Sequence, residues 1–400
     1  MIPRLAVALA ALPAIAPLPA MADETVRQIA ARVFQPVIED FDIPGLAVGV
    51  TIGGEHHIYT HGVASRETGA PVSADTIFEL GSISKLFTVT LAALAEGRGL
   101  LSLEEPVSTY RPELSRSVFD RITPINLATH TTGGLPLQVP DRVGSEAGLM
   151  HYLSEWWPAS AVGRTRSYSN IGIGLLGLIV AERFGTSYAR AAQELLFPAL
   201  GLDSTYIEVP ESAAARYAFG HAKGDDRPIR VEPGMLDAEA YGVKSSARDM
   251  LRFLDAHLGD AHLGDAHLGD AHLGQAALAP EIRAALDKTR TGYFKTAYYV
   301  QNLVWEQYPW PTNLKRLIDG NASEMALEIQ PVQQVARPLP PKDTVLLNKT
   351  GSTYGFGAYV ALLPGEALGI VVLANRNYPN AARVAATYRL IERLLWTTGG

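Results

Sequence analysis

The stretch "ELGSISKLFTVTLAALAEGRG", residues 79–99, decides which fold we expect, because it combines a core helix with polar residues at its entrance. From Ile83 onward the stretch is apolar on almost every side, as a helix within a core is. Its first turn carries Ser82 and Lys85, which are three residues apart and therefore share one helix face. Since a lysine is almost never fully buried unless it is paired, either Lys85 reaches solvent or the protein makes use of it.

The first 22 residues, "MIPRLAVALAALPAIAPLPAMA", have the features of a secretory signal peptide. One positive charge, Arg4, precedes an apolar segment that ends in a small-x-small pattern. A membrane anchor is the weaker interpretation, because prolines interrupt the run and it falls short of about 20 apolar residues. We therefore expect residues 1–22 to be removed, the mature chain to begin at Asp23, and the protein to be exported to the periplasm without a membrane-spanning segment.

Composition excludes several classes of function. Of the 400 residues 47% are hydrophobic and none is cysteine, which excludes cysteine nucleophiles and zinc sites built on cysteine. An exported chain without disulfides depends on its core, and this chain is long enough to form a sizeable one. The net charge is −7 and no lysine- or arginine-rich run occurs, so the electrostatic footprint of a nucleic-acid-binding protein is missing. We expect a monomer with no cofactor, no metal and no nucleic-acid partner.

Strand patterns lie at both ends of the chain and helical patterns lie between them. The expected elements are strands over residues 46–52 and 55–64, three short strands beginning at Thr344, Gly357 and Gly369, helices between residues 96 and 204, and an amphipathic helix over residues 381–395. This order predicts an α+β fold, in which an antiparallel sheet from both termini is flanked by helices and carries a mainly helical lobe. Within one domain, residues 23–400, the α/β lobe is expected at about 23–96 and 335–400, and the helical lobe with its binding loops at about 97–334.

An internal repeat, "DAHLGDAHLGDAHLGDAHLG", occupies residues 255–274. Structural repeat units run to tens of residues, so a period of five does not indicate a solenoid. In an α-helix successive histidines of this repeat would be about 140° apart and would not share one face. We expect a tandem duplication in a tolerant surface segment, with a His/Asp metal-binding tract as the alternative.

Three short motifs carry residues with catalytic chemistry. Ser82 to Lys85 form an S-x-x-K motif at a helix start, "YSN" at residues 168–170 is a Y-x-N motif in a loop, and "KTG" at residues 349–351 lies at a strand end before Ser352. Each motif alone has an ordinary interpretation as a helix cap, a turn or a strand end. In this order and on these elements, they match the pattern of enzymes that acylate a serine.

The residue types fit nucleophilic catalysis by serine. The Ser82 hydroxyl is a weak nucleophile and needs a neighbouring base. A lysine serves as that base only when burial or other cations lower its pKa from about 10.4. Lys85 and Lys349 in one pocket would disfavour each other's charge and favour the phenolate of Tyr168, which would take the Ser82 proton and later pass it to a leaving nitrogen. The backbone N–H groups of Ser82, at the positive end of the helix dipole, and of Ser352 are the expected oxyanion hole.

Together these motifs resemble those of class C (AmpC-type) serine β-lactamases over essentially the whole mature chain. The segments that carry the resemblance are "ELGSISK", "GGLPLQVPD" from Gly133, "RSYSN", "LDAEAYGVKS" from Leu236, "NKTGSTYGFGAYVA" and "LANRNYPNAAR". The resemblance implies the fold shared by serine β-lactamases and penicillin-binding proteins. It also implies hydrolysis of the β-lactam amide of cephalosporins and penicillins through an acyl-serine intermediate, which gives antibiotic resistance.

The resemblance assigns roles to individual residues. The implied catalytic residues are Ser82, Lys85, Tyr168 and Lys349, and the implied substrate-binding residues are Gln138, Asn170, Tyr241, Thr350, Gly351, Ser352 and Asn377. Gln138 and Asn170 would bind the amide side chain of the antibiotic. Tyr241 would form a wall of the cleft, and Asn377 would lie near the substrate carboxylate. Tyr354 replaces the small residue that is usual in its turn, which leaves the substrate spectrum open.

Other functions remain as alternatives. D-alanyl-D-alanine carboxypeptidases and family VIII-type esterases share part of the pattern, but Lys349 argues against both. Carboxypeptidases of this lineage have H-T-G where this chain has K-T-G, and such esterases usually lack K-T-G. A non-hydrolysing penicillin-sensing module is a further alternative, although such sensors normally carry a transmembrane segment. Class A β-lactamases are disfavoured because the chain has no E-x-x-x-N motif. "HHIYTH" from His56 lacks the H-x-H-x-D spacing of metal-dependent β-lactamases, and we expect its histidines to be solvated strand residues.

Overall fold

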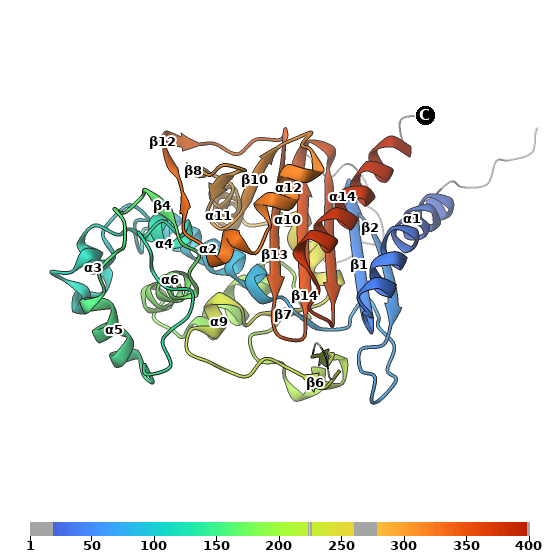
Figure 1. Ribbon diagram of the computed structural model, residues 1–400, viewed down its shortest axis with the longest axis horizontal. Coiled ribbons are helices and arrows are strands. Elements are labelled where there is room, and N and C mark those ends of the chain that lie inside the picture. Colours follow the sequence, from blue (N-terminus) through green and yellow to red (C-terminus); the bar gives the residue numbers. More distant parts are fainter. Residues whose placement is uncertain (1–18, 223, 225, 260–277, 398–400) are drawn as a thin grey trace, which may run out of the picture.

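The computed structural model describes residues 19–222, 224, 226–259 and 278–397, and nine strands within them form one antiparallel sheet (Figure 1). The order across the sheet is β12-β8-β9-β10-β13-β14-β15-β1-β2. The strands are β1 (Gly45–Ile52), β2 (Glu55–Gly62), β8 (Gly292–Lys295), β9 (Val300–Asn302), β10 (Glu306–Pro309), β12 (Gln333–Leu339), β13 (Val345–Ser352), β14 (Gly357–Leu363) and β15 (Leu368–Ala374). Strands from the two ends of the chain meet where β1 pairs with β15, for example Val48 opposite Val372. The predicted sheet from both termini is confirmed.

The central strands are buried on both faces, which explains their continuous apolar sequences. Because side chains alternate between the faces of a strand, Val360 of β14 enters one hydrophobic cluster and its neighbour Tyr359 enters another. The first cluster contains side chains of α2, α10 and α11, and the second contains side chains of α1 and α14. These helices are α1 (Pro19–Asp40), α2 (Ser84–Gly97), α10 (Ala247–Leu258), α11 (Pro280–Thr289) and α14 (Asn380–Thr397). Figure 1 shows α1 and α14 side by side on one face of the sheet.

A lobe of shorter elements lies beside the sheet, at the left of Figure 1. Its helices are α3 (Val107–Tyr110), α4 (Pro124–Ala128), α5 (Glu146–Glu155), α6 (Asn170–Arg183), α7 (Tyr188–Arg190), α8 (Phe197–Ala199) and α9 (Asp237–Ala240). The other short elements are α12 (Leu314–Gly320), α13 (Glu324–Leu327), β3 (Phe78–Glu79), β4 (Thr165–Arg166), β5 (Gly220–His221), β6 (Pro228–Ile229), β7 (Lys244–Ser245) and β11 (Gln330–Pro331). The apolar helix α6 packs against the apolar helix α2, and this packing is one of the contacts between the lobes.

The expected boundary between the lobes needs correction. The sequence pattern assigns residues 292–309 to the helical lobe, but they form β8, β9 and β10 and continue the main sheet between β12 and β13. These strands have three or four residues each and carry buried polar side chains such as Gln301 and Asn302. No apolar alternation therefore marks them in the sequence, and pairing with distant strands decides their conformation.

The expectation of a surface segment is wrong for the first copy of the DAHLG repeat. This copy forms the last turn of α10, where Asp255 and His257 are each only 2% exposed. Asp255 accepts a hydrogen bond from Thr51 Oγ1 (2.6 Å) and pairs with His56 Nε2 (2.5 Å). The copy belongs to the core because it continues the buried face of α10 toward the β1–β2 hairpin. The other three copies, residues 260–274, lie outside the described residues.

The histidines of β2 are also less solvated than the sequence indicates. His57 is only 4% exposed, and His56 is paired with Asp255. The cause is tertiary, because α10 packs on the face of the hairpin that carries His56 and α1 packs against β2 on the face that carries His57. A strand pattern alone does not reveal which helix will cover it.

In the described part of the chain, we find no helix with the length and apolar character needed to cross a bilayer. Helix α1 begins at Pro19, so the predicted cleavage before Asp23 falls within its first turn. Cleavage at this position stays a prediction.

Candidate active site

Ser82 lies in a single 3₁₀ turn between β3 and the N-terminus of α2. Strand β13 passes so close to this turn that two glycines are required. A Cβ atom at Gly81 would lie 2.4 Å from the backbone N of Ser352, and one at Gly351 would lie 1.9 Å from the carbonyl O of Leu80. Gly81 also has a φ of +53°, a conformation that favours glycine. The two glycines therefore allow the backbone amide of Ser352 to lie against the turn that carries Ser82.

Lys85 does not reach solvent, because it is completely buried in the first turn of α2. Its Nζ donates hydrogen bonds to Ser82 Oγ (3.0 Å) and to the carbonyl O of Ala240 (2.6 Å). Burial lowers the pKa of Lys85 to about 8, against the opposing effect of Tyr168 and with a further lowering by Lys349. A lysine with this pKa is available in both protonation states in mildly alkaline solution, so it can exchange protons with its neighbours.

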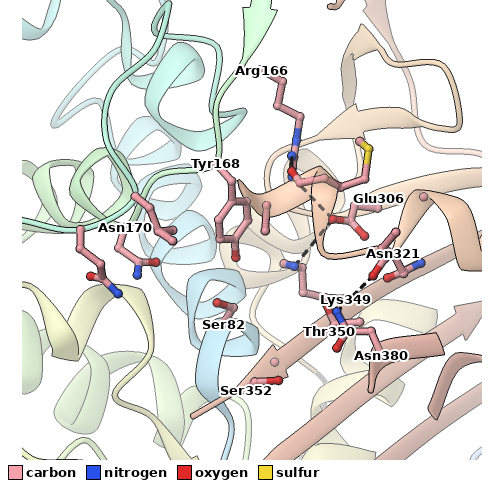
Figure 2. Close-up of a pocket in the computed structure, with 17 residues that line it drawn as sticks. Ser82, Arg166, Tyr168, Asn170, Glu306, Asn321, Lys349, Thr350, Ser352 and Asn380 are labelled. Atoms are coloured by element: carbon pink, nitrogen blue, oxygen red, sulfur yellow. Dashed lines mark hydrogen bonds and ion pairs between the residues drawn. The ribbon is translucent and has the colours of Figure 1, made fainter. Parts of the chain in front are cut away.

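Tyr168 points its hydroxyl toward Ser82 (Figure 2). Three cationic groups surround its ring, with the Nζ of Lys85 at 5.1 Å, the Nζ of Lys349 at 5.2 Å and the guanidinium of Arg166 at 5.2 Å from the ring centroid. Burial by itself would raise the pKa of Tyr168. Lys349, Lys85 and the nearby Ser82 hydroxyl outweigh that effect and lower the pKa from 10.0 to about 8. The site therefore makes the Tyr168 phenolate accessible next to the Ser82 hydroxyl in mildly alkaline solution.

Glu306 lies between two of these cations. Its Oε1 is 3.7 Å from Lys349 Nζ and 3.7 Å from Arg166 Nη2, and all three side chains are almost completely buried (Figure 2). Arg166 Nε also donates a hydrogen bond to Gln301 Oε1 (2.8 Å). Since one carboxylate is shared by two cations, the group keeps a net positive charge beside Tyr168. Sequence reasoning missed the roles of both residues: Arg166 begins the quoted segment "RSYSN" but lies outside its Y-x-N motif, and Glu306 belongs to none of the quoted segments.

These side chains line a cleft of about 280 Å³ (Figure 2). Eight of the residues expected from the sequence line it, namely Ser82, Gln138, Tyr168, Asn170, Lys349, Thr350, Gly351 and Ser352. Lys85 is outside the lining and lies behind Ser82, to which it is hydrogen-bonded. The backbone N of Asn170 donates to the carbonyl O of Leu137 (2.8 Å). That bond ties the loop that carries Gln138 to the start of α6, so both amide side chains enter the cleft from one side.

Two residues that the sequence predicts in the cleft do not line it. Tyr241 follows the end of α9 and is half-buried outside the lining. Asn377 is also outside, and its Oδ1 accepts a hydrogen bond from Arg383 Nη2 (3.2 Å). Asn380, the first residue of α14, lines the cleft instead and donates from Nδ2 to the carbonyl O of Asn321 (3.1 Å). The motif located the correct segment, but the turn before α14 decides which of its side chains faces the cleft.

Two further side chains support the site from outside the cleft. Arg383 is fully buried and donates from Nη1 to the carbonyl O of Gly351 (2.7 Å) and to Ser352 Oγ (3.2 Å). It therefore holds the end of β13 that approaches Ser82. Ser84, the second serine of the helix entrance, accepts a hydrogen bond at Oγ from the backbone N of Val243 (2.9 Å). This serine has a structural contact and does not line the cleft.

Among the residues that the structure describes, no group of three or more His, Asp or Glu side chains is arranged to hold a metal ion. The His/Asp tract of residues 260–274 lies outside them. The alternative of a metal-binding repeat therefore stays untested.

Comparison with known proteins gives the family. A family model described as Beta-lactamase matches residues 30–395, which include every element around the cleft. The chain belongs to the β-lactamase family. The family and the fold predicted from the motifs are thus confirmed for this β-lactamase, whereas the catalytic roles of its individual residues stay predictions.

Individual relatives agree with this assignment. A β-lactamase of Pseudomonas fluorescens is 40% identical over 370 residues, which cover 92% of this chain and 99% of that protein. The crystal structure of a class C β-lactamase from Rhodobacter sphaeroides is 54% identical, covers 92% of this chain and 99% of that chain, and has a TM-score of 0.85. A crystal structure described as D-alanine carboxypeptidase AmpC from Burkholderia cenocepacia is 40% identical, with coverage of 92% and 99% and a TM-score of 0.84.

Proposed function

We propose that the protein hydrolyses the β-lactam amide of cephalosporins and penicillins through an acyl-serine intermediate and so gives antibiotic resistance. One observation carries the proposal. Ser82 Oγ lies 3.0 Å from the buried Lys85 Nζ and beneath Tyr168, whose pKa is lowered to about 8. Family membership and the similarity to class C enzymes support the same function.

In the acylation step, the phenolate of Tyr168 takes the proton from Ser82 Oγ, which attacks the lactam carbonyl carbon. The carbonyl oxygen becomes an oxyanion, and the backbone N–H groups of Ser82 and Ser352 are its proposed donors. The carbon–nitrogen bond then breaks, and the phenol of Tyr168 passes its proton to the leaving nitrogen. Lys85 and Lys349 stabilise the phenolate electrostatically before and after each transfer. The product of this step is an ester on Ser82.

In the deacylation step, a water molecule attacks the carbonyl carbon of that ester. Tyr168 takes one proton of the water and returns it to Ser82 Oγ as the ester bond breaks. The same two backbone N–H groups would stabilise the second oxyanion. The ring-opened acid leaves, and the serine, the phenolate and the two lysines return to their starting states.

Substrate recognition is proposed for the two sides of the cleft. Lys349 and Thr350 on β13, together with Asn380 of α14, present a cation and polar groups to the substrate carboxylate. Gln138 and Asn170 present amide groups on the opposite side, where the amide side chain of the antibiotic would bind. This arrangement replaces Asn377 with Asn380 near the carboxylate.

The proposal is tested by mass spectrometry and by turnover of the chromogenic cephalosporin nitrocefin. The peptide that contains Ser82 should gain the mass of the antibiotic, and Ser82→Ala should remove both the adduct and turnover, with a loss of about 10⁶-fold. Ser84→Ala is the matched control, because it removes the neighbouring hydroxyl that binds Val243 and should still form the adduct. Hydrolysis by Ser82→Ala above about a thousandth of the wild-type rate would contradict the assignment.

Cleavage of D-alanyl-D-alanine peptides is a second candidate function. The similarity to the Burkholderia cenocepacia carboxypeptidase favours it, and it would use the same acyl-serine chemistry. The two functions are separated by comparing kcat/KM for nitrocefin with kcat/KM for an acylated D-alanyl-D-alanine peptide. A higher value for the peptide would make the protein a carboxypeptidase. A single stoichiometric burst with no further turnover of either substrate would indicate a penicillin-sensing module.

We further propose that the protein acts as a monomer in the periplasm after removal of residues 1–22. The apolar segment after Arg4 supports export. Periplasmic fractionation and N-terminal sequencing test this, with Asp23 as the expected first residue. Sedimentation equilibrium tests the monomer, and a stable dimer at micromolar concentration would contradict it.

A further inference from the structure

His130 contacts the chain on both sides of Tyr168. Its carbonyl O accepts a hydrogen bond from the backbone N of Ser167 (2.8 Å), and its Nδ1 accepts one from the backbone N of Ser169 (3.2 Å). The imidazole also packs against the Tyr168 ring, with centroids 4.3 Å apart and planes inclined by 40°. His130 is 1% exposed, so these contacts are made away from solvent. One residue thus holds the segment that carries the phenol at three points.

The hydrogen bond from Ser169 determines the protonation state of the imidazole. A backbone N–H can only donate, so Nδ1 must carry a lone pair and the ring proton must be on Nε2. A protonated imidazole would have two N–H groups and would lose this acceptor. Burial lowers the pKa of His130 well below its usual value, and the charges of Arg166, Lys85 and Lys349 lower it further. The side chain is therefore neutral near pH 8, where Tyr168 and Lys85 titrate.

We propose that His130 is a positioning residue that holds the Tyr168 phenol over Ser82 as a neutral imidazole protonated on Nε2. The inference rests on the proposed proton transfer by Tyr168. Neutrality has two effects here: it preserves the hydrogen bond from Ser169, and it keeps a further positive charge away from the ring. Because the phenol must come within hydrogen-bonding distance of Ser82 Oγ to take its proton, a displacement of about 1 Å is expected to cost about 100-fold in rate.

Two substitutions separate positioning from general stability. His130 has a φ of +60°, which asparagine tolerates well and alanine poorly. His130→Asn places an amide oxygen near the position of Nδ1 and retains an acceptor for Ser169, whereas His130→Ala removes both the acceptor and the ring. We expect His130→Ala to lower kcat about 100-fold with KM within threefold, and His130→Asn to recover kcat to within about tenfold of the wild type. Both values are taken per active site, titrated by the acyl-enzyme burst.

Arg116→Ala is the control for backbone strain, because Arg116 has a φ of +66° and is exposed in another part of the lobe. It should leave kcat unchanged. If His130→Ala keeps kcat per titrated site within threefold of the wild type, or if asparagine recovers none of the loss, the positioning role is wrong. If Tyr168→Phe itself turns over normally, the failure lies in the proposed mechanism and not in the contact with His130.

Nuclear magnetic resonance tests the proposed protonation state of His130 directly. The ¹⁵N and ¹H signals of the His130 imidazole, assigned by their loss in His130→Asn, should show the Nε2-protonated neutral form from pH 5 to pH 8. A titration midpoint within that range, or a proton on Nδ1, would overturn the inference.

Discussion

Replacement of Gly81 by alanine tests the close approach of β13 to the turn that carries Ser82. The new Cβ would lie 2.4 Å from the backbone N of Ser352, whereas an ordinary contact begins near 3.4 Å. The strand end must therefore move by about 1 Å, and a misplacement of that size is expected to cost about 100-fold in rate. Alanine at a φ of +53° adds about 1–2 kcal/mol of backbone strain. We expect kcat to fall far more than KM rises, because an oxyanion donor acts mainly in the transition state.

Gly53→Ala is the matched control for the strain. Gly53 has a φ of +57° in the turn between β1 and β2, and a Cβ there would meet nothing within 4 Å. Both variants should lose about 1–2 kcal/mol of stability from left-handed backbone strain in urea denaturation, and Gly81→Ala should lose more because its Cβ also clashes with Ser352. Only Gly81→Ala should lose nitrocefin turnover. The reasoning is refuted if the two variants have the same kcat, or if Gly81→Ala stays within fivefold of the wild type.

Three further predictions concern the titration of the site and the repeat. The folded pKa of Tyr168 is about 8, below its ordinary 10.0. In urea denaturation, the stability of the wild type relative to Tyr168→Phe should therefore rise as the pH rises from about 8 to 10, and this gain should be lost as the pH falls through 8. A difference in stability that does not depend on pH would contradict this. Asp255→Ala removes the carboxylate that Thr51 and His56 contact, so it should lower stability by about 2 kcal/mol and leave kcat unchanged. A loss of stability below about 0.5 kcal/mol would show that these contacts are dispensable. Deletion of residues 260–274 keeps this buried first copy and should leave kcat/KM within threefold, because each doubling of a connection costs only about 0.6 kcal/mol; a tenfold loss would make the repeat functional.

Much of the fold was predictable because local patterns and tertiary packing agree at its centre. The continuous apolar runs of β14 and β15 and the apolar sequence of α6 require burial on all sides, so they fold as predicted. The strands β8, β9 and β10 were not predictable, since their three or four residues carry no periodic signal. The first DAHLG copy was assigned to the surface for a similar reason: only the packed hairpin provides the partners of Asp255.

The sequence by itself determined which nucleophile, phenol and lysines we expect in the cleft. Ser82, Tyr168 and Lys349 stand in motifs whose residue types suit only a few reactions, so their order along the chain was sufficient to predict the family. Only the tertiary structure decided the geometry and the electrostatics. The burial that lowers the pKa of Lys85, the carboxylate of Glu306 between two cations, and the choice of Asn380 over Asn377 all arise from contacts between distant segments. A motif records which groups are present, whereas distance and desolvation, which set pKa values and reactivity, exist only once those segments pack together.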